Sequence, residues 1–137
     1  MRTLIVTSLT VLFASVLAMA DEKKASPVRV LDVKIDGEVT NRFGSPVVIA
    51  DLEQLAKAIK DEAAFAVIKK AVDFDKEQVV YFAWSGSGQD KLAFAAGTDK
   101  KGPDVIVTYT PGRTRDVRMH KMLFALPKDA KFKVVGP

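Results

Sequence analysis

Ser87 and His120 have side chains that could act together as a nucleophile and a base. His120 is the only histidine, and an imidazole that takes the proton of a serine hydroxyl turns that serine into a nucleophile. With nearby carboxylates, two such sets can be written: Ser87–His120–Asp90 and Ser85–His120–Asp116. Any chain with serines and aspartates allows as much, so a small hydrolase that uses Ser87 and His120 is one hypothesis among several.

The segment around this serine, Trp84-Ser-Gly-Ser-Gly-Gln-Asp90, is rich in glycine. Gly86 and Gly88 let the backbone turn sharply and present N–H groups, which suits a nest for an anion. A nucleophile elbow would read G-x-S-x-G between a strand and a helix, and a phosphate loop would need Lys-Ser or Lys-Thr before a helix. The segment has neither pattern, and we therefore favour a tight turn between two strands.

The second polar segment runs from Pro111 to Lys121. Pro111-Gly112 suits the middle of a type II turn, in which the glycine takes a positive φ. Four permanent cations, one carboxylate and the histidine follow, a set that could bind an anionic ligand or the carboxylates of a partner. The alternative is an ordinary solvated strand with one structural ion pair. We predict that Arg115 pairs with Asp90 and so ties the two turns together.

Together the two segments, 84–90 and 111–121, define the predicted binding face. Its residues are Trp84, Asp90, Arg113, Arg115 and His120. Trp84 ends a predicted strand beside the glycine-rich turn, so we expect it to be partly exposed, where it could stack on a ligand or on an arginine. With one histidine, no cysteine and no D-x-D-x-D-G calcium loop, neither a metal site nor a cofactor is predicted.

The hydrophobic pattern predicts the elements that position these residues. Strands are expected over 27–35 and 47–49, a capped helix begins at Asp51, and a helical piece over 61–72 either continues that helix or stands alone. Residues 79–84 are apolar on both faces, which predicts a central strand that is covered on both sides. The later strands are expected over 91–96, 105–109, 117–126 and 131–135, with a bulge near His120, where the apolar phase switches.

This order of elements predicts an α+β fold. We expect a largely antiparallel β-sheet or a small sandwich of about six strands, with one or two helices packed on it.

The N-terminal residues predict export. Arg2 precedes an apolar stretch that ends near Leu17, and Ala18-Met19-Ala20 offers an A-x-A cleavage site. We expect residues 1–20 to be a signal peptide, 21–26 a flexible leader and 27–137 a single globular domain, in the periplasm or outside the cell. No cysteine follows the signal to carry a lipid anchor, and no later apolar run is long enough for a membrane span.

Two stretches carry a family likeness: residues 81–92, YFAWSGSGQDKL, and residues 109–126, YTPGRTRDVRMHKMLFAL. Together they resemble a group of small exported bacterial proteins with no assigned activity, from about the first helix to the C-terminus. A fainter likeness, in strand order and in the late rhythm of charged turn, strand and proline, is to small β-rich domains that associate with secreted proteases. The resemblance implies a family, and no function comes with it.

The sequence favours a small exported binding or interaction domain over an enzyme, because no coherent catalytic set stands out. Its partner would be an envelope protein, an exported protease or an anionic glycan. The net charge of +4 is too mild, and mostly too evenly spread, for nucleic acid. The alternatives are the hydrolase that uses Ser87 and His120, and a structural envelope protein without a ligand.

Overall fold

The computed structural model describes residues 28–36, 43 and 46–136. The predicted signal peptide and leader, residues 1–26, lie outside the described residues. The described ranges contain seven strands and two helices: β1 (Arg29–Leu31), β2 (Val47–Ile49), α1 (Leu52–Ala58), α2 (Glu62–Ala71), β3 (Glu77–Ser87), β4 (Lys91–Ala96), β5 (Val105–Thr110), β6 (Val117–Pro127) and β7 (Phe132–Val135). This content agrees with the predicted α+β fold, which is mostly strand.

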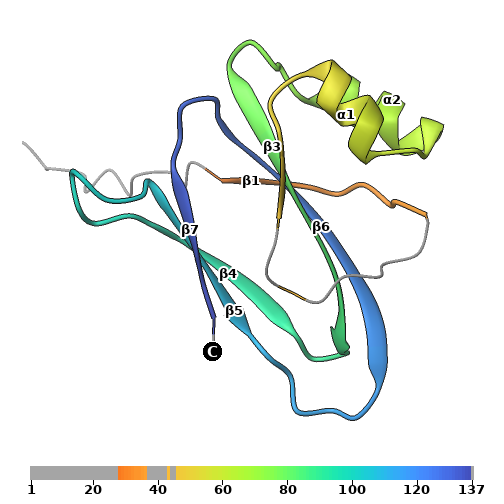
Figure 1. The fold of residues 1–137 in the computed structure, drawn as a ribbon, viewed down its shortest axis with the longest axis vertical. Coiled ribbons are helices and arrows are strands. Elements are labelled where there is room, and N and C mark those ends of the chain that lie inside the picture. Colours follow the sequence, from red (N-terminus) through yellow and green to blue (C-terminus); the bar gives the residue numbers. More distant parts are fainter. Residues whose placement is uncertain (1–27, 37–42, 44–45, 137) are drawn as a thin grey trace, which may run out of the picture.

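The strands form two sheets (Figure 1). The first has the order β1-β6-β3-β2 and is antiparallel throughout. The second has the order β4-β5-β7, with β4 and β5 antiparallel and β5 and β7 parallel. The prediction of largely antiparallel pairing therefore holds, with the β5–β7 pair as the exception. The two central strands of the first sheet, β3 and β6, are also the longest strands.

Strand β3 is buried on both faces, as its sequence predicts. Val79 belongs to a core cluster that also contains Leu55 of α1 and Ile68 of α2. The next residue along, Val80, belongs to a second cluster that contains Val105 of β5 in the other sheet. Because successive side chains of a strand point to opposite faces, one face of β3 packs under the helices and the other packs against the second sheet.

Two separate helices form, which answers the question that the sequence left open. The Asp51 carboxylate accepts a hydrogen bond from the Gln54 N–H at 2.8 Å and caps α1. Asp61 caps α2 by accepting from the N–H groups of Ala63 and Ala64 at 2.9 and 3.1 Å. Such caps satisfy amides that no helical carbonyl reaches. Figure 1 shows both helices near the upper end of β3 and β6.

The predicted bulge near His120 is wrong. β3 and β6 pair residue for residue from Glu77 opposite Pro127 to Ser87 opposite Val117, with no residue left over. Val117 and Met119 lie on the same face of β6 as the buried Leu123, but they are 78% and 59% exposed. The apparent change of phase arises because these two apolar side chains remain on the surface rather than because the strand changes direction.

Candidate functional site

The two polar segments singled out in the sequence meet at the lower end of the molecule in Figure 1, where β3 turns into β4 and β5 leads into β6. We call this place the turn junction and define it as residues 87–90 and 111–116. Both connections cross from one sheet to the other at the same end. Hydrogen bonds join the two connections, some between a side chain and the backbone and one between two side chains.

Asp90 holds the turn junction together. Its Oδ2 accepts hydrogen bonds from Trp84 Nε1 at 3.0 Å and from the Tyr109 hydroxyl at 2.9 Å. Its Oδ1 accepts from the backbone N–H of Gly112 at 2.7 Å. One carboxylate thus links β3, β5 and the connection before β6, and it does so with donors that suit its negative charge.

The ionisation of this carboxylate follows from its surroundings. Partial burial alone would raise the pKa of Asp90, but the hydrogen bonds from Gly112, Trp84 and Tyr109 stabilise the charged form and hold the pKa below its ordinary value. Burial raises the pKa of Tyr109, and the hydrogen bond to Asp90 and its negative charge add to that effect. Asp90 is therefore set to be an acceptor for internal donors rather than a general acid.

Ser87 lies at the centre of a second set of bonds. Its Oγ lies 2.5 Å from Oγ1 of Thr114 and accepts from the backbone N–H groups of Thr114 and Gln89 at 3.2 and 3.3 Å. Beside it, the Gly88 N–H donates to Asp116 at 3.3 Å. The Ser87 hydroxyl is thus occupied in joining the two connections.

Asp116 is likewise engaged within this end of the molecule. A hydrogen bond from Thr114 contributes most to lowering the pKa of Asp116, and bonds from Gly88 and Arg118 act in the same direction against the effect of burial. Arg118 donates from Nε to Asp116 at 2.7 Å and forms a salt bridge with it. The positive charge of Arg118 is therefore largely balanced.

Gly112 is needed for close approach, not for a positive φ. A β-carbon at this position would overlap Ser87 Oγ and come within 2.6 Å of the Gln89 carbonyl carbon. The backbone of Gly112 does not take the positive φ of the predicted type II turn. The absence of a side chain lets the second connection lie directly against the first and brings its N–H to Asp90.

Trp84 is 1% exposed, so the expectation of a partly exposed ligand platform is wrong. Its ring is stacked on His120, the residue opposite it on β6, with a centroid separation of 4.7 Å and an interplanar angle of 13°. Tyr109 and Phe43 pack against it edge to face. Trp84 and Asp90 are therefore inner supports of the predicted face.

The Ser87–His120 contact that a hydrolase would need is not formed. Nε2 of His120 lies 2.8 Å from the backbone carbonyl oxygen of Ser87, which can only accept, so this nitrogen is the donor. The Ser87 hydroxyl is bonded to Thr114 and Gln89 instead. In the other possible set, Asp116 accepts from Gly88 and Arg118, and Ser85 is exposed on β3.

The predicted Arg115–Asp90 pair is wrong, although Asp90 does tie the two turns. The donor is the Gly112 N–H, which reaches Asp90 because the glycine lies so close. Arg115 is exposed, and its side chain forms no hydrogen bond or ion pair with any part of the chain that the structure describes. The same holds for the side chains of Lys91 and Arg113.

A shallow depression of about 460 Å³ lies beside two of these three cations. Lys91 and Arg113 line it, together with the backbone-rich stretches 88–89 and 110–112. Arg115 follows two residues after Arg113. We call Lys91, Arg113 and Arg115 the basic rim.

Tyr109, Thr114 and Gly112 are the members of this site that sequence reasoning missed. Tyr109 packs against the second core cluster, which contains Val105 and Val107. Its hydroxyl bond to Asp90 depends on how two distant turns pack, which no local pattern encodes. The only signal for Gly112 was the glycine itself, which pointed to a turn.

Comparison with known proteins adds no assignment. No family model, curated protein or solved structure matches the chain. Within the described ranges, no three histidine, aspartate or glutamate side chains gather as metal ligands would, and no helix there has the length and apolar character to cross a membrane. The geometry of the turn junction is therefore the basis for a functional proposal.

Proposed function

We propose that this chain is an exported binding domain without a catalytic role, and that the basic rim is its contact surface. The partner would carry carboxylates or other anions: an acidic surface of an envelope protein or exported protease, or an anionic glycan. The A-x-A site at residues 18–20 supports export to the periplasm or beyond. In this proposal the two sheets are the layers of a small sandwich, and the turn junction lies at one end of it.

The observation that carries the proposal is an imbalance of charge at the hydrogen-bonded turn junction. The carboxylates of Asp90 and Asp116 accept hydrogen bonds from donors within the molecule. The side chains of the basic rim form no hydrogen bond or ion pair with any of the described residues. The cations therefore stand on a scaffold that internal bonds have already ordered. A preorganised surface loses less conformational entropy when it binds.

The contact would be electrostatic and weakened by salt. Exposed cations interact with a bound polyanion over a distance of about 10 Å at 0.1 M ionic strength and over much less at 1 M. Two anionic probes, poly-L-glutamate and polygalacturonate, represent the acidic protein and the anionic glycan. Binding of either probe to the purified protein can be measured by calorimetry at increasing salt concentration.

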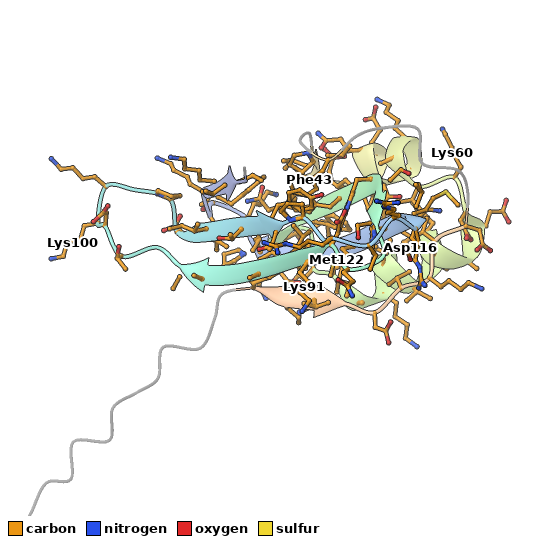
Figure 2. The ribbon with its side chains drawn as sticks, turned by 90° about the horizontal axis from the view of Figure 1, so that it is seen from below. Phe43, Lys60, Lys91, Lys100, Asp116 and Met122 are labelled. Atoms are coloured by element: carbon orange, nitrogen blue, oxygen red, sulfur yellow. The ribbon has the colours of Figure 1, made fainter. Side chains whose placement is uncertain are left out.

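Charge reversal separates the basic rim from general positive charge. We expect Arg113→Glu with Arg115→Glu to weaken binding of the preferred probe by roughly tenfold or more. The matched control is Lys100→Glu with Lys101→Glu, which makes the same charge change at exposed positions. Figure 2 shows Lys100 at the opposite end of the molecule from Asp116. Equal losses in both variants, or no binding of either probe, would refute the proposal, and the second result would favour a structural protein without a ligand.

A further inference from the structure

Among the strands that the structure describes, β4 lies at an edge of the second sheet. It pairs with β5 over all six of its residues, and no strand of the described ranges pairs with its other side. The backbone N–H and C=O groups along such an edge are a template for another extended chain. A partner that pairs with this edge would therefore do so as an extended strand.

The edge of β4 lacks the protection that edge strands usually carry. β1 and β2 have only three residues each, and β7 has four with Lys133 among them. β4 has a single charge, Lys91, at its first position, followed by Leu-Ala-Phe-Ala-Ala. Short length and charges in the strand are common devices against edge-to-edge pairing, and β4 has neither beyond its first residue.

We propose that β4 pairs antiparallel with β4 of a second copy of this chain, so that the second sheet continues across a two-fold axis. Residues directly opposite in an antiparallel pair share a face, so the pairing must keep Leu92 and Phe94 on the core side. One register that does so places Phe94 opposite itself and Ala93 opposite Ala95. A second register keeps the same side chains on each face and places Leu92 opposite Phe94 and Ala93 opposite itself.

The side chains of β4 fit this self-pairing. In both registers an alanine lies opposite an alanine on the outer face. Lys91 lies opposite a small uncharged residue, Gly97 or Ala95. No like charges meet. On the inner face, Leu92 and Phe94 are only partly buried although they pack against the second core cluster. A second copy would cover their outer side and extend that cluster, a gain that a polar partner strand would not give.

The test measures self-association directly. Sedimentation of the purified protein over a wide concentration range should give a mass that rises toward twice the monomer. Ala93→Lys with Ala95→Lys brings lysines opposite lysines in both registers, and we expect association to become roughly tenfold weaker or worse. The matched control is Ala63→Lys with Ala66→Lys, which adds the same charge at exposed positions of α2 and should leave the dimer intact.

A charge-complementary pair makes the assignment specific. Equal amounts of the lysine variant and of Ala93→Glu with Ala95→Glu should form a mixed dimer, because both registers then place an introduced lysine opposite an introduced glutamate. A protein that stays monomeric at millimolar concentration would overturn the proposal, and so would a dimer that the β4 lysines leave unchanged. Because both alanines are exposed, circular dichroism should show all variants folded. This proposal is independent of the anionic partner, since it rests on the edge of β4 alone.

Discussion

At the scale of single residues, the carboxylate of Asp90 is expected to stabilise the fold through the three hydrogen bonds that it accepts. We expect Asp90→Asn to lower the free energy of unfolding by about 1–3 kcal/mol, because hydrogen bonds to a charged acceptor are lost and a donor is left facing a donor. If the oxygen of the new asparagine takes the place of Oδ2, its NH₂ group takes the place of Oδ1 and faces the Gly112 N–H. Urea denaturation measures the change, and Asp99→Asn, at an exposed carboxylate with no side-chain bond in the described ranges, is the control.

The same variant should alter the response to acid. The pKa of Asp90 is lower in the folded chain than its ordinary value of 3.8, so its charged form contributes stability above that value. The contribution is lost as the pH falls through 3.8 toward the lower folded pKa. As the pH falls from neutral to below 3.8, the free energy of unfolding of the wild type should therefore decrease more than that of Asp90→Asn. Parallel acid dependences, or an Asp90→Asn protein as stable as wild type, would contradict the role given to this carboxylate.

At the scale of elements, the two buried faces of β3 make it intolerant of charge. Val80→Asp should abolish soluble expression, because Val80 is 1% exposed and an aspartate there would be a buried, unpaired charge. Val117→Asp makes the same change on the partner strand β6 at a side chain that is 78% exposed, and we expect near-normal melting. Soluble yield and thermal unfolding decide the matter. Normal melting of the Val80→Asp protein would place β3 at the surface.

The local features of these elements could be predicted from the sequence. Asp51 and Asp61 begin helices because an aspartate before an apolar stripe satisfies the first amides of a helix. Residues 79–84 were predicted as a doubly covered strand because apolar side chains fall on both phases, and the structure confirms it. In each case the pattern and the interaction that causes it lie within a few neighbouring residues.

The errors arose where exposure or distant packing decides the outcome. Val117 and Met119 are apolar but exposed, so a rule that places apolar residues in the core reported a bulge that does not exist. Trp84 was expected to be partly exposed because it ends a predicted strand, yet β3 continues to Ser87 and the ring is covered by Tyr109 and Phe43.

At the scale of the whole molecule, the meeting of segments 84–90 and 111–121 was anticipated, but the pairing within it was not. Two turns can be placed at one end of a sheet from chain direction alone. Which donor reaches Asp90 depends on a close approach that Gly112 permits. The sheet order β1-β6-β3-β2 is similarly beyond local patterns, since it joins the first strand to the sixth across most of the chain.

Trp84 is the only tryptophan of the chain, and this gives the protein a built-in optical probe. Its indole is buried and bonded to Asp90, so its emission should lie at short wavelength and move to longer wavelength when water enters. Far-ultraviolet ellipticity reports on the strands and on the helices, and the helices lie at the other end of the molecule (Figure 1). If the two signals trace one denaturation curve, both ends unfold as a single cooperative unit. If the emission shifts at lower urea, the end that contains Trp84 opens first while the helices remain folded.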